Sequence, residues 1–137
     1  DYFRIKVMEV LYHIEKTQIE NRFDGRYFNR EQVQITKGVK EYLISHIDEN
    51  ISVEKLAVSS GININIFYQI FMEIYGETPY AYLKRYRMNV AAVQLLTGER
   101  RIGDIAMELG YSNASKFAKA FYSVYGELPR EYRKKRR

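Results

Sequence analysis

Residues 102–133 read IGDIAMELGYSNASKFAKAFYSVYGELPREYR, and this stretch decides the fold. Its apolar residues recur at spacings of three and four, which predicts helices. Gly110 separates a short helix from a longer one, because glycine readily adopts the left-handed conformation in which a helix ends. Gly126 ends the longer helix, and Pro129 opens another at the first helical position, where proline is tolerated.

The same design stands earlier in the chain, at residues 53–82, which read VEKLAVSSGININIFYQIFMEIYGETPYAY. Equivalent residues lie 49 positions apart up to the central glycine and 50 apart after it. The second copy therefore has one extra residue just after its glycine, where a turn can accommodate it. A repeat of this length indicates two copies of one structural unit. The recurring residues are Val53, Leu56, Ala57, Gly61, Phe67, Phe71, Tyr75, Gly76, Glu77, Pro79 and Tyr82, which return as Ile102, Ile105, Ala106, Gly110, Phe117, Phe121, Tyr125, Gly126, Glu127, Pro129 and Tyr132.

Further helices are expected around the repeat. Residues 79–96 predict a connecting helix about 27 Å long at ~1.5 Å per residue. Residues 34–48 predict a supporting helix, and residues 2–19 predict one with two apolar stripes. That helix packs on its own domain, or it meets an absent domain or a partner subunit. In the supporting helix, the inward residues are Val39, Tyr42, Leu43 and Ile47, with Asn29 and Gln32 at capping-box spacing ahead of it.

The predicted fold class is therefore all-α, with two helix-turn-helix subdomains joined by a long connecting helix and preceded by an N-terminal linker helix. The chain starts at Asp1 rather than Met, so we expect a piece of a longer protein. The expected division is a helical linker from a missing sensor or dimerisation domain (1–32), the first subdomain (33–77), the connecting helix (78–98) and the second subdomain with a basic tail (99–137).

Positive charge is concentrated at the C-terminal end. Residues 100–137 hold ten Lys or Arg and four Asp or Glu, whereas the rest of the chain is nearly neutral. A basic segment of this kind suits a polyanion, although it also serves as a solubilising tail.

Other features narrow the class of protein. The chain has no cysteine, which fits a reducing cytoplasm, and the charged N-terminus is unlike a signal peptide. No Gly-rich phosphate loop, nucleophile elbow or metal-ligand cluster occurs, and His13 and His46 lie far apart. The sequence therefore predicts a cytoplasmic protein without catalysis, cofactor, metal or membrane attachment.

The repeat also resembles a known family. Residues 104–133, DIAMELGYSNASKFAKAFYSVYGELPREYR, closely resemble the C-terminal signature of AraC/XylS-type transcription regulators, and residues 53–96 are similar to the preceding half of the same domain. The resemblance covers about residues 33–134, and residues 2–32 resemble the family's linker more weakly. It implies sequence-specific binding to promoter DNA, with two recognition helices in successive major grooves about 34 Å apart. It also favours an activator that contacts RNA polymerase.

In the first unit, the recognition helix is expected at about residues 63–75, with the apolar residues of the repeat inward. The outward residues near its start are Ile64, Asn65, Tyr68 and Gln69, which match the family's base-reading positions. Asn65 and Gln69 can pair with adenine, and Ile64 can contact a thymine methyl group. Tyr68 can reach a phosphate. Because this helix has no Lys or Arg, its affinity is expected to be low or its target A/T-rich.

In the second unit, the recognition helix is expected at about residues 113–124. Its outward residues are Ala114, Ser115, Lys116 and Lys119. The two lysines can read guanine edges or hold phosphates, and the sequence leaves both open. Ser115 occupies a position that is commonly structural in the family. Arg100 and Arg101 are candidates for backbone contact, and residues 133–137, beginning with Arg133, are either a phosphate clamp or a disordered tail.

Two other interpretations remain. The weakly basic first unit, with three isoleucines expected to be exposed (Ile62, Ile64 and Ile66), also fits a protein-interaction module that has lost strong DNA binding. The thirteen tyrosines suit stacking on single-stranded nucleic acid, but most fall on inward positions, which favours core packing. A dimer through the N-terminal helix or the missing domain is a further expectation.

Overall fold

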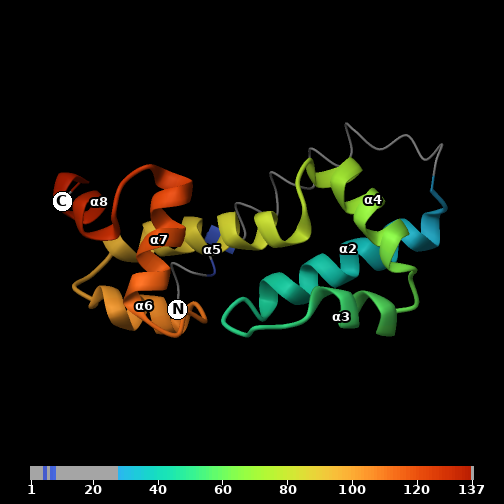
Figure 1. Ribbon diagram of the computed structural model, residues 1–137, viewed down its shortest axis with the longest axis horizontal. Coiled ribbons are helices and arrows are strands. Elements are labelled where there is room, and N and C mark those ends of the chain that lie inside the picture. Colours follow the sequence, from blue (N-terminus) through green and yellow to red (C-terminus); the bar gives the residue numbers. More distant parts are fainter. Residues whose placement is uncertain (1–4, 6, 9–27, 137) are drawn as a thin grey trace. The chain divides into compact units, whose positions relative to one another are not determined.

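The computed structural model describes residues 5, 7, 8 and 28–136 (Figure 1). In this part of the chain every regular element is a helix, which confirms the predicted all-α class. The predicted N-terminal linker helix lies almost wholly outside the described residues. The helices are α2 (Arg30–Ser45), α3 (Val53–Ser59), α4 (Ile64–Tyr75), α5 (Pro79–Leu96), α6 (Ile102–Glu108), α7 (Ala114–Tyr125) and α8 (Pro129–Arg136).

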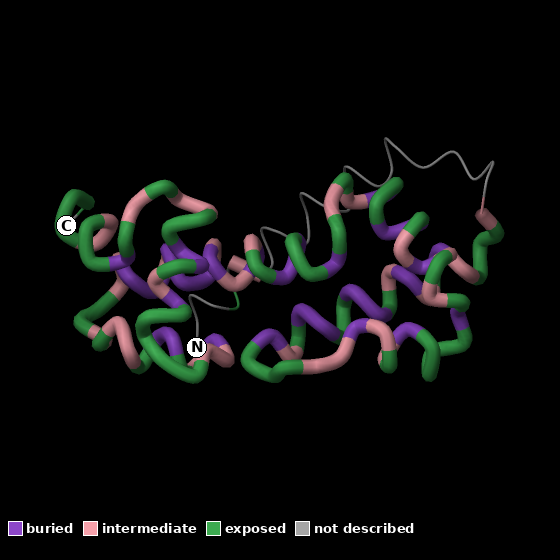
Figure 2. Tube along the Cα trace, viewed as in Figure 1, coloured by how far each residue is buried: buried purple, intermediate pink, exposed green. Residues whose placement is uncertain are grey.

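These helices form two compact units. We call the first unit α2, α3, α4 and α5 up to Leu83, and the second unit residues 47–50, α5 from Lys84, and α6, α7 and α8. Each unit contains one copy of the repeat. Buried positions alternate with exposed ones along the helices of both (Figure 2), as expected for helices with one inward face.

The core of the first unit is built on α4. Its residues Phe67, Ile70, Phe71 and Ile74 are almost wholly buried. Spacings of three and four put these side chains on one face, and burying each contributes roughly 1.5–3 kcal/mol. Helices α2 and α3 cover this face with Val33, Val39, Leu43, Ile44, Val53 and Ala57.

The second unit repeats this arrangement on α7. Phe117 and Phe121 are fully buried, together with Ile105 and Ala106 of α6. The part of α5 that belongs to this unit also has buried residues, namely Tyr86, Met88, Val90, Ala91 and Leu95.

An aromatic cluster closes each unit. Tyr82 meets Phe71 at a ring-centroid distance of 5.5 Å and Tyr75 at 5.3 Å. The equivalent distances in the second unit are 5.3 Å and 5.4 Å. The residues of the second unit that form these contacts are Phe121, Tyr125 and Tyr132. Tyrosines at these positions therefore pack with the core, as the sequence predicts.

The turn between the two helices of each unit depends on its glycine. Gly61 and Gly110 adopt φ values of +94° and +88°, which side chains other than hydrogen rarely allow. The two differ in their surroundings. A Cβ on Gly110 would lie 2.9 Å from the carbonyl oxygen of Asp48, whereas one on Gly61 would meet nothing within 4 Å. Gly110 therefore also permits a close backbone approach.

Three details differ from the sequence-based expectations. The supporting helix begins at Arg30 rather than residue 34, because Asn29 caps it by accepting a hydrogen bond from the backbone of Gln32 at 2.7 Å. Tyr42 does not face inward: its side chain is 45% exposed and its ring stacks on His46 at 4.0 Å. Ile62 is buried rather than exposed, because it directly follows the turn and packs inward.

None of the described helices is long and apolar enough to cross a membrane. Within the same residues, no three His, Asp or Glu side chains are grouped as metal ligands.

Candidate nucleic-acid interface

Helix α4 presents a polar surface at its N-terminal end. Asn63 caps the helix, its side-chain oxygen accepting hydrogen bonds from the backbones of Asn65 and Ile66 at 2.8 and 3.3 Å. Asn65 and Gln69 are exposed, and Ile64 is half-buried. The amide side chains of this helix therefore face solvent, opposite the buried phenylalanines.

Tyr68 lies on the same helix but is held from within the first unit. Its hydroxyl donates a hydrogen bond to the Glu54 carboxylate at 2.5 Å, and Tyr80 donates to the other oxygen at 2.7 Å. These bonds lower the pKa of Glu54 to about 2. The Tyr68 bond raises the pKa of that tyrosine to about 12. An ionised carboxylate thus stands beside the outward face of α4, where a phosphate contact by Tyr68 was expected.

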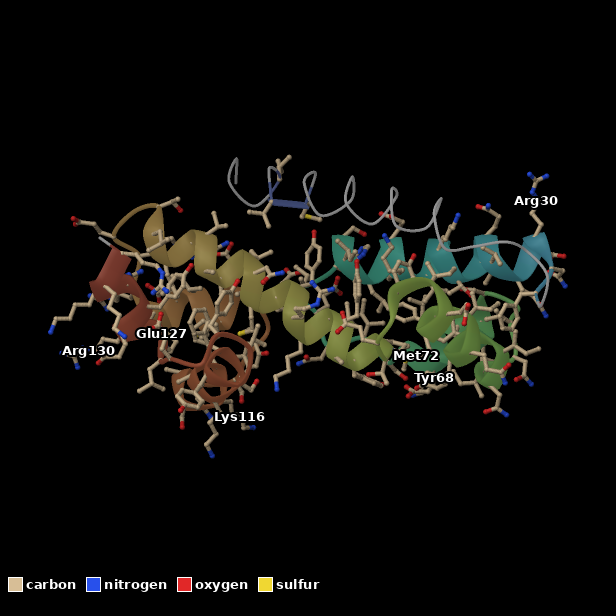
Figure 3. All side chains as sticks on the ribbon, turned by 90° about the horizontal axis from the view of Figure 1, so that it is seen from above. Arg30, Tyr68, Met72, Lys116, Glu127 and Arg130 are labelled. Atoms are coloured by element: carbon tan, nitrogen blue, oxygen red, sulfur yellow. The ribbon has the colours of Figure 1, made fainter. Side chains whose placement is uncertain are left out.

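Figure 3 shows Tyr68 with Met72, which lies one turn further along α4 and is 46% exposed. The outward face of the first unit therefore combines amide, aromatic and apolar groups. None of its residues on α4 carries a positive charge.

Helix α7 presents a different surface. Asn113 caps it by accepting a hydrogen bond from the backbone of Lys116 at 2.8 Å. Ala114, Ser115, Lys116 and Lys119 are all exposed. Figure 3 shows Lys116 extending away from the ribbon. The expected outward residues of the second unit thus share one solvent-facing surface that carries two lysines.

The three arginines predicted outside the recognition helices are placed differently from one another. Arg101 is exposed at the N-cap position of α6. Arg100 forms an ion pair with Glu108 and a hydrogen bond of 3.3 Å with the side chain of Gln94. Arg133 is half-buried and donates from Nε to the carbonyl oxygen of Leu95 at 2.9 Å. Two of the three are therefore engaged within the second unit.

The basic tail is helical in the described residues, since α8 runs to Arg136. Glu127 anchors it by pairing with Lys135 at 3.1 Å and with Arg136. These partners hold the pKa of Glu127 below its usual range, the Lys135 bond contributing most. Arg136 also lies over the Tyr132 ring, 4.1 Å from its centroid. Arg130, at the start of α8, is exposed (Figure 3).

Sequence reasoning missed two charged residues near these surfaces. In the sequence, Glu54 looks like any acidic residue on the solvent-facing side of a helix. Its two tyrosine partners are 14 and 26 residues away, so no local pattern indicates them. Arg87 reads as part of the polar face of α5, yet it donates to the carbonyl oxygens of Ile47 and Glu49 at 2.8 and 3.2 Å.

Comparison with known proteins identifies this architecture. A family described as a helix-turn-helix domain matches residues 56–135. The regulatory protein SoxS of Salmonella typhimurium is 33% identical over 100 residues, which are 73% of this chain and 94% of SoxS. A crystal structure of a probable AraC family transcriptional regulator from Rhodopseudomonas palustris is 27% identical, with a TM-score of 0.63, and the match covers 76% of this chain and 98% of that one. The chain belongs to the AraC family of transcription regulators.

Another AraC-type structure agrees with this assignment. The C-terminal domain of AraT, a response regulator from Geobacillus stearothermophilus, has a TM-score of 0.70 and 26% identity, covering 74% of this chain and 85% of that one. The resemblance inferred from the repeat is thereby confirmed, together with the fold of two helix-turn-helix units. As a member of the AraC family, the protein is a DNA-binding transcription regulator.

Proposed function

We propose that this AraC-family domain binds promoter DNA sequence-specifically, with α4 and α7 as recognition helices in successive major grooves. One observation carries the proposal: both helices bury the phenylalanines of one face and leave polar side chains exposed near their N-terminal ends. The N-terminal part of a recognition helix is the part that meets base edges.

The two helices are proposed to contribute differently. On α4, Asn65 and Gln69 pair with base edges, while Ile64 and the ring of Tyr68 contact bases through apolar atoms. On α7, the lysines add the charge that α4 lacks, beside Ala114 and Ser115. Arg101 contacts the DNA backbone, and Arg100 and Arg133 support it from within the second unit.

Several wider features follow as proposals from family membership. The regulator acts in the cytoplasm, without catalysis, and activates transcription together with RNA polymerase. Residues 1–32 form a linker to a sensor or dimerisation domain. The whole protein dimerises through the N-terminal helix or through that domain. Residues 33–77 and 99–137 form the two DNA-binding subdomains, joined by 78–98.

The buried position of Ile62 weighs against an interaction module, because the patch of three exposed isoleucines does not form. Gel-shift titration distinguishes the two functions. DNA binding predicts a preference for a selected duplex over random DNA, with affinity that falls steeply as salt rises. A flat salt response, or equal binding to both duplexes, would favour the interaction module instead.

A further inference from the structure

The second unit contains a pocket beside the N-terminal end of α7. Its volume is about 240 Å³, several times the ~30 Å³ that a water molecule occupies, so it has room for a small polyatomic group. Among the residues that the structure describes, no carboxylate side chain lines it. The lining residues are Asn50, Arg87, Leu109, Gly110, Tyr111, Ser112 and Lys116.

Arg87 forms a fixed cation in the wall of this pocket. Its Nε and Nη2 atoms donate to the carbonyl oxygens of Ile47 and Glu49, which hold the guanidinium in place. Within the described residues, Nη1 has no hydrogen-bond acceptor. Burial lowers the pKa of Arg87, but a guanidinium stays charged in proteins.

Lys116 supplies a second cation from α7. Its backbone amide is bound by the Asn113 cap, while its amino group has no partner among the described residues. The side chain is exposed, so it can fold over the mouth of the pocket or extend into solvent. Ser112 and Tyr111 add hydroxyl groups to the lining.

The pocket depends on a close approach of two backbone segments. Gly110 lies against the carbonyl of Asp48, with a hypothetical Cβ only 2.9 Å away, and this contact places Asn50 beside the turn that precedes α7. Asp48 interacts electrostatically with Arg87, so two cations in the lining face one nearby carboxylate. The balance remains positive, and Arg87 and Lys116 can only donate hydrogen bonds.

We propose that this pocket is a phosphate-binding site, in which Arg87, Lys116 and Ser112 hold the oxygens of one phosphate group. Two cationic side chains and a hydroxyl group that line one pocket suit an oxyanion. This inference rests on the proposed function, because the phosphate is then a backbone phosphate of the bound DNA. A free phosphate or phosphorylated small molecule offers the same chemistry. With DNA, Lys116 contacts phosphate, whereas Lys119, outside the pocket, is left to read a base.

The first test uses Lys116→Ala in the full chain, with Lys119→Ala as a matched control on the same helix. On a duplex selected from random DNA and on random DNA, Lys116→Ala is expected to weaken binding by the same factor, about tenfold for a charged hydrogen bond. The salt slope should fall by about 1. Lys119→Ala should weaken binding to the selected duplex more than to random DNA. Replacing single phosphates of the duplex by neutral methylphosphonates should reveal one position whose effect disappears in Lys116→Ala.

The second test uses the chain without DNA. Sodium phosphate, compared with sodium chloride at equal ionic strength, is expected to shift the amide NMR signals of Gly110, Tyr111 and Ser112 saturably. Lys116→Ala should abolish these shifts.

Coupling to one methylphosphonate assigns the site to DNA, and saturable shifts without that coupling assign it to a free phosphate. Absence of both overturns the proposal. A chain that prefers no duplex but still binds phosphate would instead defeat the proposed DNA-binding function and leave the pocket standing. Selective DNA binding without either phosphate signal would support the proposed DNA-binding function and overturn the phosphate site.

Discussion

In the first unit, the carboxylate of Glu54 is held by the hydroxyls of Tyr68 and Tyr80, beside the outward face of α4. The repeat places no acid at the equivalent point of the second unit, where an exposed arginine stands in place of Tyr80. The equivalent residues are Gly103, Ala118 and Arg130. The two units therefore share one architecture but differ in surface charge. The first unit has an anion, Glu54, where the second has a cation, Arg130, at the position of a neighbouring residue.

This difference shows which part of the repeat determines the fold and which part determines function. The buried aromatic clusters agree to within a few tenths of an ångström in their ring distances. The surface residues diverge in charge. Since DNA is a polyanion, the second unit should provide most of the electrostatic affinity and the first should provide mainly sequence discrimination.

The largest expected effect concerns the two turn glycines. Gly61→Ala should destabilise the protein by about 1–2 kcal/mol, because its φ is left-handed but its surroundings are open. Gly110→Ala adds a clash with the Asp48 carbonyl, for a total of about 2–5 kcal/mol. Urea unfolding of both variants measures the difference. Equal losses would show that the close approach at Gly110 contributes nothing.

The next effect compares Gln69 and Lys119, which occupy equivalent positions of the repeat. Each alanine variant should weaken binding to a selected duplex by about 1–3 kcal/mol if the side chain reads a base. Only Lys119→Ala removes a charge, so only it should change the salt dependence. Fluorescence anisotropy at several salt concentrations measures both quantities. An unchanged salt slope for Lys119→Ala, or a reduced one for Gln69→Ala, would remove the proposed division between the units.

A smaller effect follows from the charges at Glu54 and Arg130. Glu54→Gln should strengthen DNA binding and Arg130→Gln should weaken it, each by less than about 1 kcal/mol, since both groups are close to solvent. Both effects should vanish near 1 M salt, where screening acts within ~3 Å. If Glu54→Gln weakens binding at low salt, the carboxylate acts by positioning Tyr68 rather than by repelling DNA.

The smallest effect is spectroscopic and tests the Glu54 cluster directly. The folded-state pKa of Glu54, about 2, lies below its ordinary value of 4.5, so its stabilising contribution is present above pH 4.5 and is lost as the pH falls towards 2. Glu54→Gln should therefore lose stability at neutral pH, and the difference from the unmodified chain should shrink over that acid range.

Glu54→Gln should also lower the pKa of Tyr68 from about 12 towards its ordinary value of 10. The hydrogen bond from Tyr68 to the Glu54 carboxylate is the main cause of the raised pKa. Tyr125 provides an internal control in the second unit. Its pKa is also raised to about 12, mainly by burial, and should not change. Tyrosinate absorbance during an alkaline titration measures both. No shift in any tyrosine would mean that the cluster does not persist in solution.

Much of the fold follows from local signals in the sequence. The caps Asn29, Asn63 and Asn113, the glycine turns and the two prolines fix where helices begin and end, because each satisfies a backbone requirement within a few residues. The repeat then predicts that both units share one core.

Features that depend on packing between distant residues could not be predicted. The partners of Glu54 are brought to it from α4 and α5, and Arg87 meets carbonyls 38 and 40 residues away. Tyr42 fits the apolar period of α2, but stacking on His46 at the helix end leaves it exposed. Periodicity indicates which face a residue occupies, and it does not identify the side chain from another helix that meets it there.

The most direct test of the account is the selection of binding sites from random DNA by the unmodified chain, Gln69→Ala and Lys119→Ala. Two recognition helices predict two half-sites about 10 base pairs apart centre to centre. Gln69→Ala should relax the sequence of one half-site, and Lys119→Ala should relax the other. A single half-site, or two variants that alter the same half-site, would contradict the claim that both units read DNA.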